Sequence, residues 1–359
     1  MYLIRQAQLE DLSTILKLAR MVHSNNLPDD PDILRSKIVR SRKSFAGSFE
    51  NRADREFIFV LEDTETGNTI GCSSIIAAMG GPGHPHIYLQ MRKREFYSED
   101  LQTGQVHVTL QLATDESGPS EIGGLILSPA YRGHKAKLGA LLSLIRFHYM
   151  GLQREWFDDR IIAEMMGPLT PDSRNTLWDY LGRRFINLKY AEADLFCRQS
   201  KEFITSLFPK EEIYVSLLPP EARNLIGKVG SDSEPAKAML ERLGFQFHGH
   251  VDPFDGGPYL EAQLDEIELV QATRTVTLGD PADNHPRYCY LSVNGAAGFR
   301  AIQTSYAEQG DRIAIPADAA GMLGAEVGDT VGVTPAPLRR NKRASEIESK
   351  GAAKVDVTE

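Results

Sequence analysis

Strand-like and helix-like apolar patterns alternate at the start of the chain. A short apolar run at 2–4 precedes apolar residues at helical spacing through Leu18, which predicts a strand followed by a helix. Carboxylates at 29–32 mark the start of a second helix, which we expect to end near Phe49. The β-rich runs 56–62 and 70–78 are joined by a turn sequence and predict a hairpin.

The middle of the chain continues with strands and helices. Runs at 86–91 and 105–112 predict two further strands, and 121–127 predicts a strand interrupted by two glycines. A helix is expected to follow from about residue 139, then a strand over 159–166 and a helix over 175–185. This order predicts an α/β (α+β) fold, with a mixed sheet flanked by helices.

Beyond residue 264 the pattern changes to short β-type runs separated by Gly, Pro, Asn and Asp, with one short helix expected near 318–323. We therefore divide the chain into an α/β domain at 1–265 and a small β-rich subdomain at 266–334, for which assembly is a plausible role. The charged, apolar-poor tail at 335–359 is expected to be disordered.

Composition narrows the class of protein. The 359 residues are 42% hydrophobic and 25% charged, an ordinary globular balance. A formal net charge of -9 disfavours nucleic acid and acidic membranes as partners. The three cysteines lie far apart, which argues against a disulfide framework and a zinc site, so we expect no metal. Without a signal-like or membrane-spanning apolar stretch, a cytoplasmic protein is expected.

Candidate chemistry enters where the glycine-broken strand meets a basic loop. The loop contains Gly133, Lys135, Lys137 and Gly139, and it opens the following helix. Backbone N–H groups and the positive end of a helix dipole favour a pyrophosphate at such a place. The alternatives are a simple chain turn and, for the glycines of the strand, close packing of a helix on the sheet.

This order of elements resembles the core of the Gcn5-related N-acyltransferases. The resemblance implies that two strands part beside a bulge, and that coenzyme A lies there with its pyrophosphate on the loop. A backbone N–H of Gly124 or Leu125 would then stabilise the tetrahedral oxyanion of acyl transfer. The expected cofactor-binding residues are Leu125, Gly124, Arg132, Gly133, Lys135, Lys137 and Gly139.

Five sequence blocks narrow the resemblance to one family. They are 59–63 with Gly67, 125–133 with its Tyr-Arg-Gly end, 163–165, 191–194, and the Phe-Asp-Gly-Gly-Pro sequence at 254–258. Together with 219–245, they resemble the arginine N-succinyltransferase family of the alpha-chain type, over roughly residues 1–266. The resemblance implies transfer of succinyl from succinyl-CoA to the α-amino group of arginine, in arginine catabolism, with Leu125 at the succinyl-CoA contact.

The sequence departs from this family pattern in two places. Where the family carries a proton-donating histidine, this chain has Gly230, so the catalytic acid is unknown. His250 and His248 are the nearest substitutes, although they also fit a half-exposed strand. The second departure is the pyrophosphate loop, which is longer and more basic than the compact glycine run of the family.

An arginine acceptor calls for carboxylates, because a planar guanidinium is best met bidentately. Glu164 and Asp255 are the expected substrate-binding residues among the acids of the matching blocks. Asp255 also begins an Asp-Gly-Gly turn and fits a role in capping its own backbone. Glu164 lies in an apolar strand, where a buried carboxylate needs a partner or a ligand.

Three functions remain open from the sequence. The first is a working acyltransferase on arginine or a different amine. The second is a catalytically weak paralogue that binds coenzyme A and supports an active sister chain, and the third is a non-catalytic assembly module. The expected partners are a CoA thioester and an amino-acid amine, and we expect a homodimer or a hetero-oligomer with a related chain.

Overall fold

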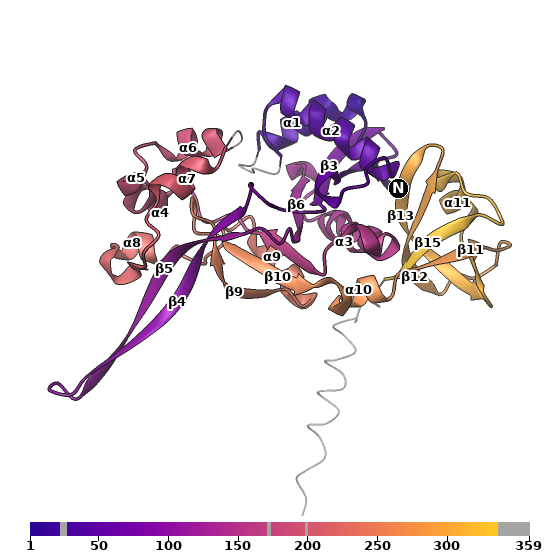
Figure 1. Ribbon diagram of the computed structural model, residues 1–359. Coiled ribbons are helices and arrows are strands. Elements are labelled where there is room, and N and C mark those ends of the chain that lie inside the picture. The colour runs from indigo at the N-terminus through magenta and orange to yellow at the C-terminus, as the bar shows by residue number, and fades with distance from the viewer. Residues whose placement is uncertain (22–26, 171–173, 198–199, 337–359) are drawn as a thin grey trace, which may run out of the picture.

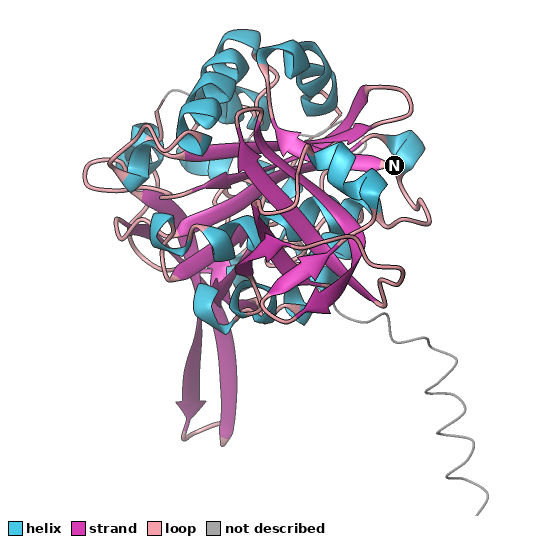
Figure 2. Cartoon of the chain, turned by 90° about the vertical axis from the view of Figure 1, so that its right-hand side faces the viewer, coloured by secondary structure: helices cyan, strands magenta, loops and turns pink. Residues whose placement is uncertain are grey.

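One hydrogen-bonded sheet runs through the molecule (Figures 1 and 2). The structure is a computed structural model that describes residues 1–21, 27–170, 174–197 and 200–336. In these ranges the strand order is β12-β15-β11-β14-β13-β1-β2-β3-β6-β7-β10-β9-β4-β5-β8. Helices flank the sheet and the C-terminal region is rich in strands, so the predicted α/β fold class is confirmed.

The first layer of helices covers the N-terminal strands. Asp30 caps the second helix by accepting hydrogen bonds from the backbone N–H groups of Asp32 and Ile33, at 2.9 and 3.0 Å. Strand β2 is buried on both faces, with Ile58 packed toward these helices and Phe59 toward the opposite side. The elements here are β1 (Tyr2–Gln6), α1 (Leu12–Ala19), α2 (Pro31–Phe45), β2 (Glu56–Asp63) and β3 (Asn68–Ile76).

The predicted β2–β3 hairpin is present, whereas α2 ends earlier than expected. The backbone N–H of Gly67 donates to the Asp63 carbonyl at 2.8 Å, and the φ of Gly67 is +68°, which closes the turn. Ala46 follows the last residue of α2, and the left-handed φ of +68° at Gly47 ends the helix four residues before the predicted end.

A long hairpin projects from the body of the molecule (Figure 1). It consists of β4 (His86–Ser98) and β5 (Thr103–Asp115), which pair along their whole length. Strand β9 (Gln246–Val251) joins it at Leu89 and Gln90, and β8 (Ile213–Tyr214) joins at Thr109 and Leu110. Residues 91–108, called the arm below, extend beyond both neighbours. The predicted strands 86–91 and 105–112 are thus parts of longer ones.

Helix α3 (Leu138–Leu152) forms the centre of the core and packs on the face of the sheet opposite α1 and α2. Its buried side chains include Leu142, Ile145 and Phe147. The Ser73 hydroxyl ties it to the sheet by donating to the Leu142 carbonyl at 2.9 Å. The elements around it are β6 (Ser120–Leu127), β7 (Arg160–Glu164), β10 (Pro258–Gln263), α9 (Glu234–Arg242) and α10 (Glu268–Gln271).

Small helices cover the sheet near the arm. The predicted helix 175–185 is divided in two, because Leu181 leaves helical geometry. The indole of Trp178 then packs directly on Gly182, where a larger side chain would collide with the ring. These helices are α4 (Thr176–Tyr180), α5 (Gly182–Phe185), α6 (Tyr190–Cys197), α7 (Glu202–Leu207) and α8 (Pro220–Arg223).

The C-terminal strands form their own apolar core and also pair with the N-terminal part of the sheet through β13 and β1. The predicted short helix near 318–323 is present. The boundary at residue 265 stays a prediction, and residues 337–359 of the predicted tail lie outside the described residues. The elements are β11 (Arg274–Leu278), β12 (Arg287–Gly295), β13 (Gly298–Gln309), β14 (Arg312–Ala314), α11 (Ala317–Leu323) and β15 (Thr330–Pro335).

A buried histidine fastens α3 to this C-terminal region. The His148 ring nitrogens lie 2.6 Å from the Thr334 hydroxyl and 2.7 Å from the Ser292 hydroxyl. Burial lowers the pKa of His148 to about 3, so the ring is neutral at physiological pH. One neutral imidazole can satisfy both hydroxyls, and this contact holds the helix in register with β12 and β15.

Candidate active site

Strands β6 and β7 are parallel neighbours only at their beginnings. Their pairing covers Ser120 with Ile161 and Glu121 with Ile162. Beyond this point β6 continues beside β3, and β7 continues beside β10. The two strands therefore part in the middle of the sheet, as the resemblance to the acyltransferase core implies.

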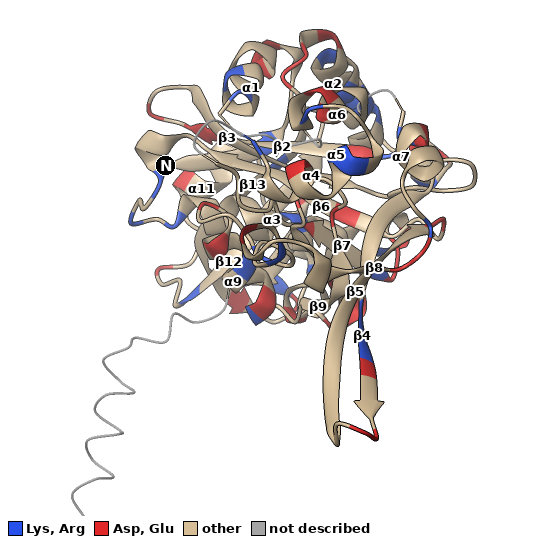
Figure 3. Ribbon diagram, turned by 90° about the vertical axis from the view of Figure 1, so that its left-hand side faces the viewer, with Lys and Arg blue, Asp and Glu red and all other residues tan. Residues whose placement is uncertain are grey.

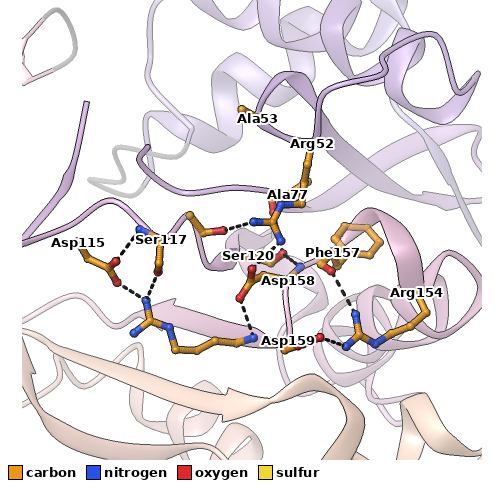
Figure 4. Close-up of polar contacts among 12 residues, drawn as sticks. Arg52, Ala53, Ala77, Asp115, Ser117, Ser120, Arg154, Phe157, Asp158 and Asp159 are labelled. Atoms are coloured by element: carbon orange, nitrogen blue, oxygen red, sulfur yellow. Dashed lines mark hydrogen bonds and ion pairs between the residues drawn. The ribbon is translucent and has the colours of Figure 1, made fainter. Parts of the chain in front are cut away.

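A polar network holds the two strands together where they start (Figure 4). The Ser120 hydroxyl donates to the Ala77 carbonyl at 2.8 Å and accepts from the Asp158 N–H at 2.9 Å. Arg52 binds the same Asp158 at 2.6 Å, and Arg160 pairs with Asp115. Because these contacts fix β6 and β7 where they start, the fold itself determines where the two strands separate.

A β-bulge lies on β6 beside the point of parting. Gly123 is opposite Ser74 and Ile126 is opposite Cys72, so Gly124 and Leu125 together face a single residue of β3. Gly124 has a φ of +56°, and a Cβ there would lie 2.7 Å from the Ser74 hydroxyl oxygen. Glycine is required for both reasons, and the bulge frees backbone groups from the ladder.

The loop before α3 has the form of an anion cradle. Gly133 has a φ of +72°, and Lys137 stands at the N-cap of α3 with a left-handed φ of +56°. Within the described ranges Lys137 makes no side-chain cap, so the start of α3 has no N-cap hydrogen bond and its first N–H groups are suited to an anion. The helix begins at Leu138, and Gly139 therefore lies in its first turn, not at the edge of the loop.

The other predicted cofactor-binding side chains surround this cradle. Lys135 and Lys137 are exposed on the loop, so both have room to reach a phosphate. Arg132 is also exposed and lies 3.6 Å from the Asp232 carboxylate, a weak surface pair that a stronger anion can replace. Leu125 stands in the bulge beside Gly124. The structure thus places all the predicted cofactor-binding residues either in the bulge of β6 or in the loop and first turn of α3.

Acidic side chains gather beside the parted strands. We call this group the acidic cluster: Glu121 on β6, Glu164 on β7, and Asp252 and Asp255 in the turn before β10. The charges of the other three all act on Glu164. The hydroxyl of Tyr259 lies 3.3 Å from both Glu164 Oε2 and Asp252 Oδ2. Several carboxylates in one partly dry place favour a cationic ligand.

Burial and mutual repulsion raise the pKa values of carboxyl groups in this cluster. Burial, followed by the charge of Asp252, raises the pKa of Glu164 well above its ordinary value. The Tyr259 hydroxyl carries a single proton, yet it lies within hydrogen-bonding distance of two carboxylates. Protonation of Glu164, which its raised pKa favours, would supply the second hydrogen bond. A carboxyl with a raised pKa is suited to proton transfer.

Asp255 has its carboxylate occupied by the backbone. Its Oδ1 accepts from the Gly257 N–H at 2.7 Å, and its Oδ2 accepts from the Gly167 N–H at 2.9 Å. Burial, followed by the charge of Asp252, raises the pKa of Asp255 to about 8 even so. Of the two roles that the sequence allows, these contacts favour capping of the turn. Substrate contact by Asp255 stays a prediction.

The glycine at the family's histidine position lies next to the cluster. The Gly230 N–H donates to the Met166 carbonyl at 2.9 Å, just beyond β7. A Cβ at Gly230 would stand 3.4 Å from the Gly167 carbonyl oxygen, which is an ordinary contact. The backbone therefore leaves room for a Cβ at the position where the family carries its histidine.

The two substitute histidines are placed differently. His248 is exposed on β9, whereas His250 binds Glu261 on β10 with its Nδ1 2.6 Å from Oε1. Although burial opposes it, the hydrogen bond from His250 holds the pKa of Glu261 below its ordinary value. A proton-transfer role for either histidine stays a prediction.

Sequence reasoning missed His86 and Tyr259. The His86 ring is buried edge-on to the Tyr259 ring at 4.7 Å, and its Nδ1 has no hydrogen-bond partner within the described chain. Burial, followed by the charge of Lys201, lowers the pKa of His86 to about 3. No pattern of spacing singles out either residue, because their meeting depends on the pairing of β9 with both β4 and β10.

The described residues contain neither a cluster suited to a metal ion nor a helix that could span a membrane. No group of three or more His, Cys, Asp or Glu side chains arranged to hold a metal ion is found there. Likewise, none of the helices within those ranges has the length and apolar character needed to cross a membrane.

The parted strands, the bulge at Gly124 and the uncapped start of α3 define the class of protein: an acyl-CoA-dependent N-acyltransferase of the Gcn5-related fold. The model of the family described as "Arginine N-succinyltransferase beta subunit" matches residues 2–269, and that of its C-terminal domain matches 272–335. The chain belongs to the arginine N-succinyltransferase family, which confirms the predicted resemblance. The matching description names a beta subunit, where the sequence suggested the alpha-chain type.

Individual relatives agree with this assignment. Arginine N-succinyltransferase from Enterobacter sp. (strain 638) is 33% identical over 336 residues, which covers 92% of this chain and 96% of that protein. The enzyme from Escherichia coli (strain 55989 / EAEC) is 32% identical over the same shares. Among solved structures, arginine/ornithine succinyltransferase subunit AI from Pseudomonas aeruginosa has a TM-score of 0.80 at 28% identity, covering 93% of this chain and 98% of that one.

Proposed function

We propose that this protein transfers the succinyl group of succinyl-CoA to the α-amino group of arginine, as a cytoplasmic enzyme of arginine catabolism. The observation that carries the proposal is the acidic cluster beside the bulge, because it offers carboxylates to a guanidinium near the place where an acyl group would react. The family's printed names supply the donor and acceptor.

Each part of the site has a task in this reaction. The start of α3, with Lys135 and Lys137, binds the pyrophosphate of the CoA thioester. The amine nitrogen attacks the thioester carbonyl, whose oxygen becomes an oxyanion beside the N–H of Gly124. Ionised Glu164 takes the proton that the amine loses, while Asp252 remains available to the guanidinium. The C–S bond then breaks.

The glycine at position 230 does not by itself prevent this reaction. The leaving thiolate has an ordinary pKa of about 8.5 and needs no strict proton donor, and general acid catalysis typically contributes only about 10²–10⁴-fold. A second candidate function follows from the same residue: a weak, CoA-binding chain that supports an active relative. Because a Cβ fits at Gly230, a Gly230→His variant can distinguish the active enzyme from the supporting chain.

Purified chain is expected to release thiol from succinyl-CoA when arginine is added, because the cluster and the bulge remain intact without the histidine. Thiol release would be followed with arginine, ornithine and a neutral amino acid as acceptors, for the unmodified chain and for Gly230→His. If only Gly230→His is active, the natural site is weakened and the supporting-chain function gains. If neither variant responds to any acceptor, the proposed reaction is wrong.

The proposal includes assembly through the arm. A two-stranded ribbon is marginally stable alone in water, yet the arm carries Phe96, Tyr97, Leu101 and Val106 at 50–75% exposure. A second exposed apolar group lies on the nearby helices and turns, which we call the helical patch: Phe185, Leu195, Phe196, Leu207 and Leu217. Since one chain carries both surfaces, a second copy can bind arm to patch twice around a two-fold axis.

Light scattering after gel filtration is expected to give twice the chain mass of 39.9 kDa. The double variant Phe96→Ser/Val106→Thr is expected to be monomeric, because it removes apolar contacts at the centre of the arm. Tyr288→Ser is the matched control, since Tyr288 is 61% exposed on the distant β12. A monomeric unmodified chain, a dimer that survives the arm variant, or association only with a related chain would each contradict the proposal.

A further inference from the structure

An arginine is buried in the middle of helix α3 without an acidic partner. Arg146 is 2% exposed, and within the described ranges its guanidinium is met only by neutral groups. Nε donates to the Ser143 carbonyl at 3.0 Å, and Nη2 donates to the Ser143 hydroxyl at 2.6 Å. Nη1 donates to the Gly123 carbonyl at 3.3 Å, which lies in the bulge of β6.

Such a residue costs stability. A buried cation loses its hydration, and here no carboxylate attraction compensates for that loss. Burial alone lowers the pKa of Arg146 to about 9, so the side chain still carries its charge at neutral pH. Packing could be satisfied by an apolar side chain of similar length, so the charge itself calls for an explanation.

The direction of one peptide bond gives that explanation. The Gly123 carbonyl and the Gly124 N–H belong to the same peptide unit, and no peptide bond in the described chain is cis. In a trans peptide the C=O and N–H point in opposite directions. Because Arg146 donates a hydrogen bond to the Gly123 carbonyl oxygen, the N–H of Gly124 is held pointing away from Arg146 and from helix α3. The bulge leaves Gly124 without a matched residue on β3.

We propose that Arg146 is a positioning residue for acyl transfer, which holds the Gly123–Gly124 peptide so that its N–H meets the acyl carbonyl oxygen. The inference rests on the proposed function. The positive charge of Arg146 also polarises this peptide and favours negative charge near its N–H, where the oxyanion forms. Ser143 holds the guanidinium from the other side, so the group does not need a carboxylate that would cancel its charge.

Three variants separate this role from a structural one. Arg146→Met removes the charge and the hydrogen bond, Arg146→Gln keeps only a neutral donor, and Arg146→Lys keeps the charge. We expect kcat to fall roughly 10–100-fold for Met and Gln, with partial recovery in Lys, and KM for arginine to change little. Because a buried unpaired cation is removed, Tm is expected to stay equal or to rise.

Coenzyme A itself provides a second measurement, because it lacks the acyl carbonyl. Its Kd is expected to be unchanged in Arg146→Met. Arg42→Met, on the exposed surface of α2, is the control for loss of an arginine without loss of activity. If Arg146→Met loses Tm, CoA affinity and kcat together, or if it keeps full kcat, Arg146 has only a structural role and the inference is overturned.

A silent wild-type enzyme would contradict the proposed function but would leave this inference testable by binding. The probe is then a ketone analogue of succinyl-CoA, in which CH₂ replaces the sulfur and the carbonyl remains. Arg146→Met is expected to lose at least tenfold in affinity for this analogue while its affinity for coenzyme A stays constant. Equal affinity for the analogue in both proteins would overturn the inference.

Discussion

Gly124→Ala is expected to lower kcat for acyl transfer by roughly 10²–10³-fold, the range found when one oxyanion donor is lost. The new Cβ would lie 2.7 Å from the Ser74 hydroxyl oxygen, at a φ of +56° that alanine adopts only with strain. Relief of both clashes requires the bulge to move, and with it the N–H that faces the oxyanion. Steady-state thiol release would measure the effect.

The control for this variant is Gly321→Ala. Gly321 lies inside helix α11, and no neighbouring atom comes within 4 Å of a Cβ built there. Alanine should therefore stabilise the helix slightly, by roughly 0.5–1 kcal/mol, and leave kcat unchanged. Full activity of Gly124→Ala with normal stability would show that the bulge does not present the oxyanion donor.

Local signals in the sequence predicted two structural features of the candidate site, the bulge on β6 and the loop before α3. Two adjacent glycines in an apolar strand predicted the bulge, and a glycine-bounded basic loop before an apolar helix predicted the cradle at α3. Both signals work at short range, because positive φ and helix starts depend on neighbouring residues. Glu164 was singled out for a similar reason, since a carboxylate in an apolar strand needs a partner.

The rest of the site depends on contacts between distant segments. Tyr259 links Glu164 on β7 to Asp252 in the turn before β10, and the sequence spacing of these residues carries no trace of that link. The arm was missed because the charged residues 92–95 of β4 (Figure 3) interrupt the apolar alternation that predicts a strand. The backbones of β4 and β5 nevertheless remain paired through these residues.

The hydrogen bonds of the turn before β10 favour Asp252 over Asp255 as the proposed guanidinium ligand, although substrate contact by Asp255 stays a prediction. Both carboxylates come from one Asp-rich turn, which the sequence alone does not resolve. Asp252 Oδ1 accepts from the N–H groups of Phe254 and Asp255, which leaves Oδ2 facing Tyr259. Asp255 instead uses both oxygens to hold two segments of backbone.

Glu164→Gln is expected to reduce kcat/KM for arginine by roughly 10²–10⁴-fold at pH 8, because the amide can neither accept the amine proton nor attract a cation. In the unmodified chain, burial and the charge of Asp252 raise the pKa of Glu164, so this carboxyl remains protonated at pH values where an ordinary one is ionised. Activity that needs the carboxylate must then rise with pH through that raised pKa. Initial rates measured as a function of pH would show this rise.

The variant is expected to have a shallower pH dependence, since Glu164 no longer titrates, whereas Asp255 keeps its pKa raised to about 8. Glutamine has nearly the shape of glutamate and removes the repulsion from Asp252, so the fold should become no less stable. Glu326→Gln, exposed in the C-terminal region, controls for loss of a carboxylate elsewhere. An unchanged pH profile with normal kcat/KM would assign proton transfer to another group, and His86 beside Tyr259 would be the first to replace.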